Sequence, residues 1–425
     1  MTETRRQMTF AFDATACSGC RCCQIACKDR NDLETGRLWR RVYEVAGGTW
    51  QRQDEGWQND VFASSLSISC NHCERPICLE GCPAAAISKR ADGIVLLDEE
   101  KCLGCGYCGW GCPYDAPQYM ADSGSMSKCS FCVEDLDAGR EPACVSACPV
   151  RALDFGYPPE LAAKPGFSGD TTAAGIHPLP DPDLTRPALL LRAHRDASRG
   201  DHEPVEVDPA PPHGLREWSL VGFTLLGQLA AGLSMSLFAS RWWFSHRGEA
   251  AVLDRLEQLG LPLVPLLILL AMSLSLLHLG SPRRASRAVL NLRSSWLSRE
   301  IVLAVFFLAA AVIAAGGQLL QPAVQAIALP ASAICGLLFV CGMARVYMLR
   351  TVPTWNRPST IVNFLGTSLL LGGLLTTAML ATVRVVMGQA AVAEPVIGWL
   401  AWLVVVVIAV LHRGGFYRSF RRVGI

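Results

Sequence analysis

The stretch "CLGCGYCGWGCP", residues 102–113, places four cysteines at steps of three, three and four residues and ends in Cys-Pro. This C-x2-C-x2-C-x3-C-P spacing is typical of ferredoxins, in which three thiolates hold one [4Fe-4S] cube and the fourth reaches a second cube. A short loop can present only three sulfurs to a four-cornered cube before the chain must leave, so the fourth ligand comes from a partner motif. The stretch therefore predicts an iron-sulfur domain.

Similar quartets occur four times, and 17 of the 19 cysteines lie between residues 17 and 148. Pairing the quartets two by two predicts four [4Fe-4S] clusters. Cys22 is left over, and we interpret it as a free thiol beside the ligands, with exchange between Cys22 and Cys23 as the open alternative. The predicted ligands are Cys17, Cys20, Cys23, Cys27, Cys70, Cys73, Cys78, Cys82, Cys102, Cys105, Cys108, Cys112, Cys129, Cys132, Cys144 and Cys148.

Two other uses of cysteine explain the pattern less well. Disulfide frameworks belong mainly to small secreted chains, and the pair Arg5 and Arg6 is not followed by the apolar segment of an export signal before Asp13. Structural zinc sites use two C-x2-C pairs for each ion, which leaves the third cysteine and the Cys-Pro ending unexplained. Structural zinc stays as the second alternative.

Composition divides the chain into three parts. Residues 1–156 carry the cysteines, residues 157–214 hold eleven of the 25 prolines, and residues 215–425 are strongly apolar. The proline-rich part is predicted to be an extended linker. A net charge of +1 gives no basic footprint for nucleic acid. The absence of a Gly-rich dinucleotide fingerprint after a strand-like segment leaves nicotinamide and flavin chemistry unsupported.

The apolar part contains runs long enough to cross a bilayer, which needs about 20 residues for each helix. The six runs are 218–240, 261–280, 301–320, 325–348, 361–383 and 395–412. The expected fold is thus an α+β ferredoxin-like domain followed by an all-α polytopic transmembrane bundle in the inner (cell) membrane. An even number of spans puts the iron-sulfur domain and the C-terminus on the same side of the membrane. The loops and helix ends on that side hold twelve arginines, whereas those on the opposite side hold four. The positive-inside rule then predicts the cytoplasmic side.

Four polar residues near the span ends on that side are predicted to bind quinone: His278, Glu300, Arg345 and Tyr347. Ionisable groups at membrane depth are costly and by default functional. A quinol that releases two electrons and two protons needs a titratable acceptor, which histidine or glutamate can supply. Snorkelling of long side chains to the interface is the alternative. Haem is not expected, because only His278 and His412 offer axial ligands within the spans.

The first half resembles the iron-sulfur subunit of the dimethyl sulfoxide reductase family in "VYEVAGGTW", "SISCNHC", "CPYDAPQY" and "CPVRALDFG". The resemblance covers nearly all of residues 8–196 and implies that outer quartets pair with each other, as do inner ones. Some relatives replace one third-quartet cysteine by tryptophan, and the presence of Cys105 here implies four cubes. The implied ligand sets are Cys17, Cys20 and Cys23 with Cys148; Cys129, Cys132 and Cys144 with Cys27; Cys70, Cys73 and Cys78 with Cys112; and Cys102, Cys105 and Cys108 with Cys82.

The second half is similar to the membrane anchor of the same family in "REWSLVGFTLLGQLAAG", "LHLGSPRRA", "ARVY" and "TVPTWN". The resemblance implies a haem-free quinol site in which His278 and Glu300 take part. It also implies a separate molybdopterin-containing catalytic subunit, with which this chain exchanges electrons from the quinone pool. The usual anchor is a separate chain of eight helices, whereas this one is fused and has six predicted spans. A cytoplasm-facing sulfite dehydrogenase that reduces quinone is the alternative assignment.

Overall fold

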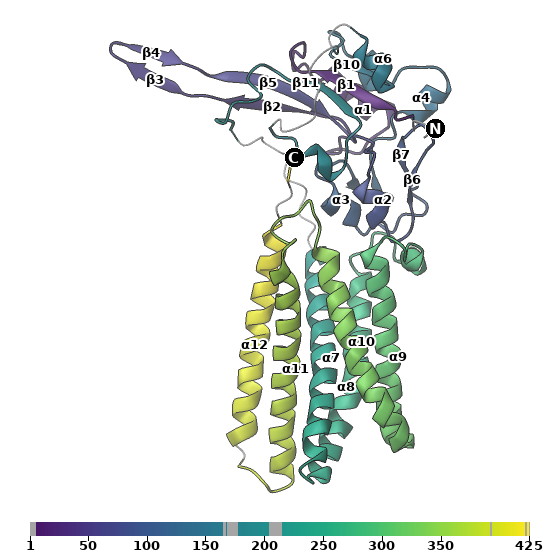
Figure 1. The fold of residues 1–425 in the computed structure, drawn as a ribbon, viewed down its shortest axis with the longest axis vertical. Coiled ribbons are helices and arrows are strands. Elements are labelled where there is room, and N and C mark those ends of the chain that lie inside the picture. The colour runs from purple at the N-terminus through teal and green to yellow at the C-terminus, as the bar shows by residue number, and fades with distance from the viewer. Residues whose placement is uncertain are drawn as a thin grey trace. The chain divides into compact units, whose positions relative to one another are not determined.

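The computed structural model describes residues 6–164, 167, 177–203, 215–391, 393–420 and 423–424. The chain forms two compact units (Figure 1). The cysteine-rich unit comprises Met1–Pro211 with Arg422–Ile425, and the helical unit comprises Pro212–Arg421. The predicted order, an α+β part followed by an all-α part, is confirmed.

A three-stranded sheet organises the cysteine-rich unit. Its central strand β1 (Thr9–Asp13) pairs with antiparallel β10 (Leu153–Gly156) and with parallel β11 (Leu189–Arg192). All five residues of β1 are buried, which fits a central strand covered on both faces. Strand β11 lies inside the segment predicted as linker, so part of residues 157–214 is built into the sheet.

Short helices and hairpins carry the cysteine loops. Helix α1 (Cys22–Arg30) packs against α5 (Ala143–Ser146), and α2 (Ile77–Gly81) packs against α3 (Tyr107–Gly111). The remaining helices of this unit are α4 (Val133–Asp137), α6 (Pro158–Ala162) and the 3-10 turn η1 (Pro182–Leu184). The antiparallel pairs are β2 (Arg41–Gly47) with β5 (Phe62–Ile68), β3 (Trp50–Gln53) with β4 (Gly56–Asn59), β6 (Ile87–Lys89) with β7 (Val95–Leu97), and β8 (Gln118–Met120) with β9 (Ser125–Ser127). The outer quartets thus share one helix pair and the inner quartets another.

The helical unit has six helices long and apolar enough to span a membrane, counted over the described residues. They are α7 (Leu215–Ser245), α8 (Ala250–Leu276), α9 (Trp296–Leu320), α10 (Pro322–Tyr347), α11 (Pro358–Val386) and α12 (Ala393–Arg418), with the 3-10 segment η2 (Pro282–Val289) between α8 and α9. Ser295 caps α9 by accepting a hydrogen bond from the Ser298 N–H at 3.4 Å. The number of spans agrees with the sequence prediction.

Helix α7 is the centre of the bundle and packs against α8, α10, α11 and α12. It crosses α11 at Gly232 and Gly372, where the two backbones touch. A Cβ atom on Gly232 would collide with the backbone of Ser368, and one on Gly372 would collide with the backbone of Gly232. Small residues at such a crossing let membrane helices approach closely.

Candidate functional site

The first two cysteines of each quartet are joined by the same tight turn. The residue before the second cysteine has a positive φ in all four quartets: Gly19 at 70°, His72 at 41°, Gly104 at 68° and Phe131 at 64°. Glycine adopts this conformation without strain, whereas His72 and Phe131 are buried with their rings 5.1 Å apart. The backbone N–H groups of Gly19, Gly104 and Phe131 each donate to the sulfur two residues earlier, at 3.5, 3.4 and 3.4 Å. The turn therefore shapes a sulfur-binding loop.

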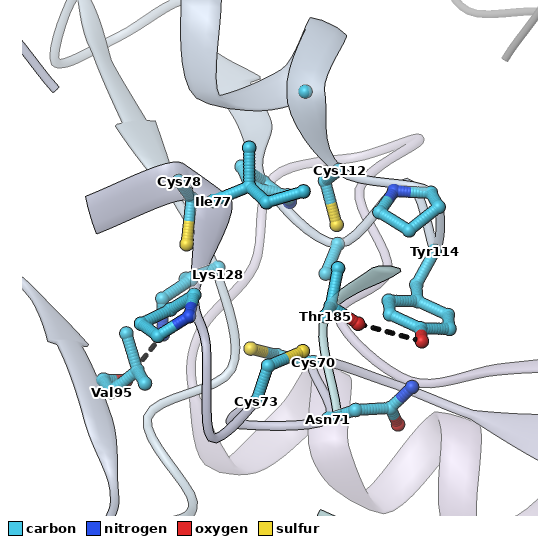
Figure 2. Close-up of a pocket in the computed structure, with 15 residues that line it drawn as sticks. Cys70, Asn71, Cys73, Ile77, Cys78, Val95, Cys112, Tyr114, Lys128 and Thr185 are labelled. Atoms are coloured by element: carbon cyan, nitrogen blue, oxygen red, sulfur yellow. Dashed lines mark hydrogen bonds between the residues drawn. The ribbon is translucent and has the colours of Figure 1, made fainter. Parts of the chain in front are cut away.

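The inner cysteines Cys70, Cys73, Cys78 and Cys112 line one pocket. Figure 2 shows their sulfurs around a common space. Burial, together with the neighbouring Cys70 and Cys112, raises the pKa of Cys78 to about 12. Three of these cysteines come from the second quartet and one from the third, which is the combination that the family resemblance implies. We refer to them as set 3.

The other implied sets also consist of neighbouring thiols. Set 1 is Cys17, Cys20, Cys23 and Cys148; burial raises the pKa of Cys17, and the other three thiols add to the effect. Set 2 is Cys27, Cys129, Cys132 and Cys144; burial, together with the neighbouring Cys144 and Cys132, raises the pKa of Cys27 to about 12. Set 4 is Cys82, Cys102, Cys105 and Cys108; burial, together with the neighbouring Cys82 and Cys102, raises the pKa of Cys105 to about 12.

This donor arrangement fits iron-sulfur cubes. Besides the turn N–H groups, the Ala86 N–H donates to the Cys82 sulfur and the Met126 N–H to the Cys102 sulfur, both at 3.3 Å. Such N–H donors stabilise thiolates bound to a cluster and tune its potential. Among the described residues, no three His, Cys, Asp or Glu side chains converge closely enough to hold a single metal ion. The sulfurs of set 3 surround a space instead, as the separate corners of a cube require.

Cys22 and Cys23 differ in burial. Cys23 is 8% exposed and its sulfur lies 3.4 Å from the Ser67 hydroxyl, whereas Cys22 is exposed and lies next to Cys20 at the surface. Cys23 therefore occupies the inward position that the x2 spacing assigns to a ligand, and Cys22 faces outward.

The helical unit contains a second candidate site around Arg413 of α12. Arg413 is 2% exposed, and its Nη2 donates to the Oε1 of the fully buried Gln228 of α7 at 2.9 Å. Its guanidinium carbon lies 3.9 Å from the ring centroid of Phe364 on α11, a cation–π geometry. The Nε of Arg413 and the Nε2 of Gln228 are buried without a hydrogen-bond partner among the described residues. These two side chains thus retain donors for a further group.

Two tyrosines and a glutamate extend this site. The hydroxyl groups of Tyr347 (α10) and Tyr417 (α12) lie 2.5 Å apart, and both side chains are buried. Glu300 of α9 is 2% exposed, interacts electrostatically with both tyrosines, and has an Oε1 atom that is buried without a partner among the described residues. We call Gln228, Glu300, Tyr347, Arg413 and Tyr417 the buried polar cluster.

Two of the four residues that the sequence predicts as a quinone site lie in the buried polar cluster. Glu300 and Tyr347 belong to the buried polar cluster, whereas Arg345 is exposed and its guanidinium carbon lies 5.0 Å from the ring centroid of Trp296. His278 is half-buried, two residues beyond the end of α8 at Leu276. Sequence reasoning did not place Gln228, Arg413 and Tyr417 in the site.

A different group of polar side chains lies at the opposite end of the bundle. Glu257 of α8 is 2% exposed and accepts hydrogen bonds from Arg241 of α7 at 3.0 Å and from Gln325 of α10 at 2.7 Å. A buried carboxylate with a guanidinium and an amide donor is satisfied by these partners. We therefore assign this group to helix packing.

Comparison with known proteins gives the family. Residues 61–157 match a family model described as a 4Fe-4S dicluster domain, and residues 212–417 match that of the DMSO reductase anchor subunit (DmsC). The B subunit of the anaerobic dimethyl sulfoxide reductase of Haemophilus influenzae is 48% identical over 192 residues, which cover 45% of this chain and 91% of that protein. The probable anaerobic dimethyl sulfoxide reductase subunit YnfG of Escherichia coli is 45% identical over 191 residues, with the same coverage.

The iron-sulfur subunit of the nitrate-inducible formate dehydrogenase of Escherichia coli is more distant, at 38% identity over 168 residues, 37% of this chain and 57% of that protein. Each of these three matches covers less than half of the chain, and the anchor model covers residues 212–417. The predicted resemblances of both halves are thus confirmed. The chain belongs to the dimethyl sulfoxide reductase family, as an iron-sulfur subunit fused to the membrane anchor subunit.

Proposed function

We propose that this chain carries electrons between the membrane quinone pool and a separate molybdopterin-containing catalytic subunit. The observation that supports this most is the order of the four cysteine sets. Cys23 of set 1 neighbours Cys144 of set 2, Cys129 of set 2 neighbours Cys70 of set 3, and Cys108 of set 4 neighbours Cys78 of set 3. The sets thus form one continuous series, as a linear electron relay requires.

Four [4Fe-4S] clusters in sets 1 to 4 would supply one-electron carriers along this series. The chain's own residues hold them: the turn N–H groups orient the thiolates, and the apolar core around Phe10 and Phe131 keeps water from them. This ligand assignment is part of the proposal.

The buried polar cluster is the proposed quinone site. A quinol must lose two protons as its electrons leave, and the Oε1 of Glu300, which has no hydrogen-bond partner among the described residues, would accept one of them. Arg413 and Gln228 each have a donor without a partner in the described part of the chain, and these donors can hold a quinone oxygen. The hydroxyl groups of the buried tyrosine pair, Tyr347 and Tyr417, lie 2.5 Å apart in the same cluster. His278, at the end of α8, is a second proton acceptor in this proposal, and no haem takes part.

The partner and the orientation belong to the same proposal. The arginine bias supports a cytoplasmic location of the iron-sulfur domain, and the relatives named as dimethyl sulfoxide reductase subunits favour a reductase of that class. A sulfite dehydrogenase partner would reverse the electron flow, and the names of the relatives give it no support.

The test is to reduce the purified complex with a quinol and follow the clusters by electron paramagnetic resonance. We expect the signals of reduced clusters to appear within the turnover time. When dimethyl sulfoxide is added, the clusters should be oxidised again and these signals should decrease. Clusters that dithionite reduces but quinol does not would contradict the relay. A reporter enzyme that works only in the periplasm can be fused to the C-terminus. Activity of this reporter would contradict the cytoplasmic orientation.

A further inference from the structure

A buried arginine, Arg40, lies beside set 2. Arg40 is 2% exposed, and its guanidinium donates to the carbonyl and hydroxyl of Ser67 at 3.4 and 3.3 Å and to the hydroxyl of Ser69 at 3.0 Å. Its guanidinium carbon lies 4.6 Å from the ring centroid of Phe10. All of these partners are neutral, and an arginine keeps its charge in a protein interior. Within the described part of the chain, no carboxylate forms an ion pair with Arg40.

The ionisable groups that act most strongly on Arg40 are cysteines. The thiols that interact electrostatically with it are Cys144, Cys129, Cys23 and Cys27. Three of these four belong to set 2, and the fourth belongs to the adjoining set 1. A buried charge is tolerated when an opposite charge compensates it. Thiolates of a bound cluster would supply that compensation at this position.

Lys128 repeats the arrangement at set 3. It is 3% exposed, and its ammonium donates to the carbonyl oxygens of Val95 and of Cys129, the latter at 3.1 Å. Figure 2 shows Lys128 at the wall of the pocket that the sulfurs of set 3 surround, bonded to Val95. The positive charge of Lys128 lowers the pKa of Cys78, whereas burial raises it. Neither acceptor partner of Lys128 is a carboxylate.

Both cations therefore lie at the two middle sets of the series, where the outer quartets meet the inner ones. A cluster held by four thiolates is an anion, and it becomes more negative when it accepts an electron. Burial in an apolar core disfavours the more negative state and lowers the reduction potential, whereas a nearby cation favours that state and raises the potential.

We propose that the positive charges of Arg40 and Lys128 raise the reduction potentials of the clusters in sets 2 and 3. Electrons can then pass from one half of the relay to the other at the junction between these two sets. This inference rests on the proposed ligand sets. The two positions differ in the cluster they affect, so each has its own spectroscopic readout.

The experiment is a potentiometric titration of the whole complex, followed by electron paramagnetic resonance. Arg40→Gln removes the charge and keeps a hydrogen-bonding side chain, so we expect one cluster midpoint to move to a more negative potential with unchanged iron content. Arg40→Lys keeps the charge, and we expect its midpoint to lie much closer to the native one. Lys128→Gln should move the midpoint of the neighbouring cluster in the same direction.

A matched control is available next to Arg40. Arg41 donates to the Asp115 carboxylate at 2.7 Å, so the double variant Arg41→Gln/Asp115→Asn removes a neighbouring charged pair with no change in net charge. We expect native midpoints in this control.

Native midpoints in Arg40→Gln and Lys128→Gln with full iron content would overturn the proposal. Loss of iron from both variants would also overturn it, because a charge that only tunes potential is not required for cluster assembly. If the proposed ligand sets are wrong, the Cys112→Ser variant keeps all of its clusters. This result distinguishes a wrong ligand assignment from a wrong role of Arg40 and Lys128.

Discussion

The two units of the chain build their polar sites over very different sequence distances. In the cysteine-rich unit, three ligands of each proposed cluster lie within one short quartet, and only the fourth comes from elsewhere. In the helical unit, the hydrogen bond between Arg413 and Gln228 joins residues 185 positions apart, and Glu300 comes from a third helix. The spacing of nearby residues in the sequence indicates the first kind of site, whereas the second kind forms only when the helices pack together.

This difference predicts different responses to substitution. A change at one quartet should remove one cluster and leave the fold of the bundle intact. A change in the bundle should alter either helix packing or quinol chemistry, and leave the clusters assembled.

The largest effect is expected for Cys112→Ser, which removes the ligand that joins the third quartet to set 3. Because the proposed relay is a single series, we expect loss of one cluster and of electron transfer from quinol. Iron analysis and electron paramagnetic resonance measure both. Cys22→Ser is the matched control and should keep the native iron content. A cluster lost in Cys22→Ser and kept in Cys112→Ser would reverse the ligand assignment.

The next effect is on the bundle. Gly372→Leu places a side chain against the backbone of α7, and overpacking of this kind destabilises by about 1–3 kcal/mol or more. We expect a lower yield in the membrane and a lower thermal midpoint. Gly366→Leu is on the same helix, where a Cβ atom would have no neighbour within 4 Å, and should behave like the native protein. Equal behaviour of the two variants would mean that α7 and α11 do not cross at Gly232.

A smaller effect, confined to quinol binding, is expected for Arg413→Gln. A charge-assisted hydrogen bond contributes about 1.5–3 kcal/mol, which corresponds to a KM for quinol about 10–100-fold higher. The cluster midpoints should stay native. Arg418→Gln, at an exposed position near the end of the same helix, is the control. An unchanged KM in Arg413→Gln would exclude Arg413 from the quinone site.

The smallest effect is expected for Arg345→Gln. Arg345 is exposed and contacts the ring of Trp296, an interaction of about 0.5–1 kcal/mol at such a site. Quinol kinetics should be nearly native. A KM increase as large as that of Arg413→Gln would place Arg345 in the site after all.

The residues show why sequence predicted one unit better than the other. The spacing from Cys102 to Cys112 dictates which chemistry these thiols can do, so the iron-sulfur domain and the six spans could be predicted. Strand β11 was missed because its partner β1 lies about 180 residues earlier, at register pairs such as Phe10 with Leu189.

The membrane site shows the limit of local patterns more clearly. Glu300 and Tyr347 stood out because polar residues are rare at membrane depth. Arg345 carried the same signal, although its side chain faces outward. Arg413 was visible as a charge at the end of the last run, but its partner Gln228 is one polar residue in the first run. Only the contact between α7 and α12 connects the two.

The most direct test of the central proposal is the rate at which quinol reduces the clusters in Glu300→Gln. Loss of a proton acceptor lowers such rates by about 10²–10⁴-fold, so we expect slow reduction by quinol and native reduction by dithionite. Glu257→Gln changes a buried glutamate at the opposite end of the bundle, and the clusters of this variant should be reduced by quinol at the native rate. A native rate of quinol-driven reduction in Glu300→Gln would contradict a quinone site in the buried polar cluster.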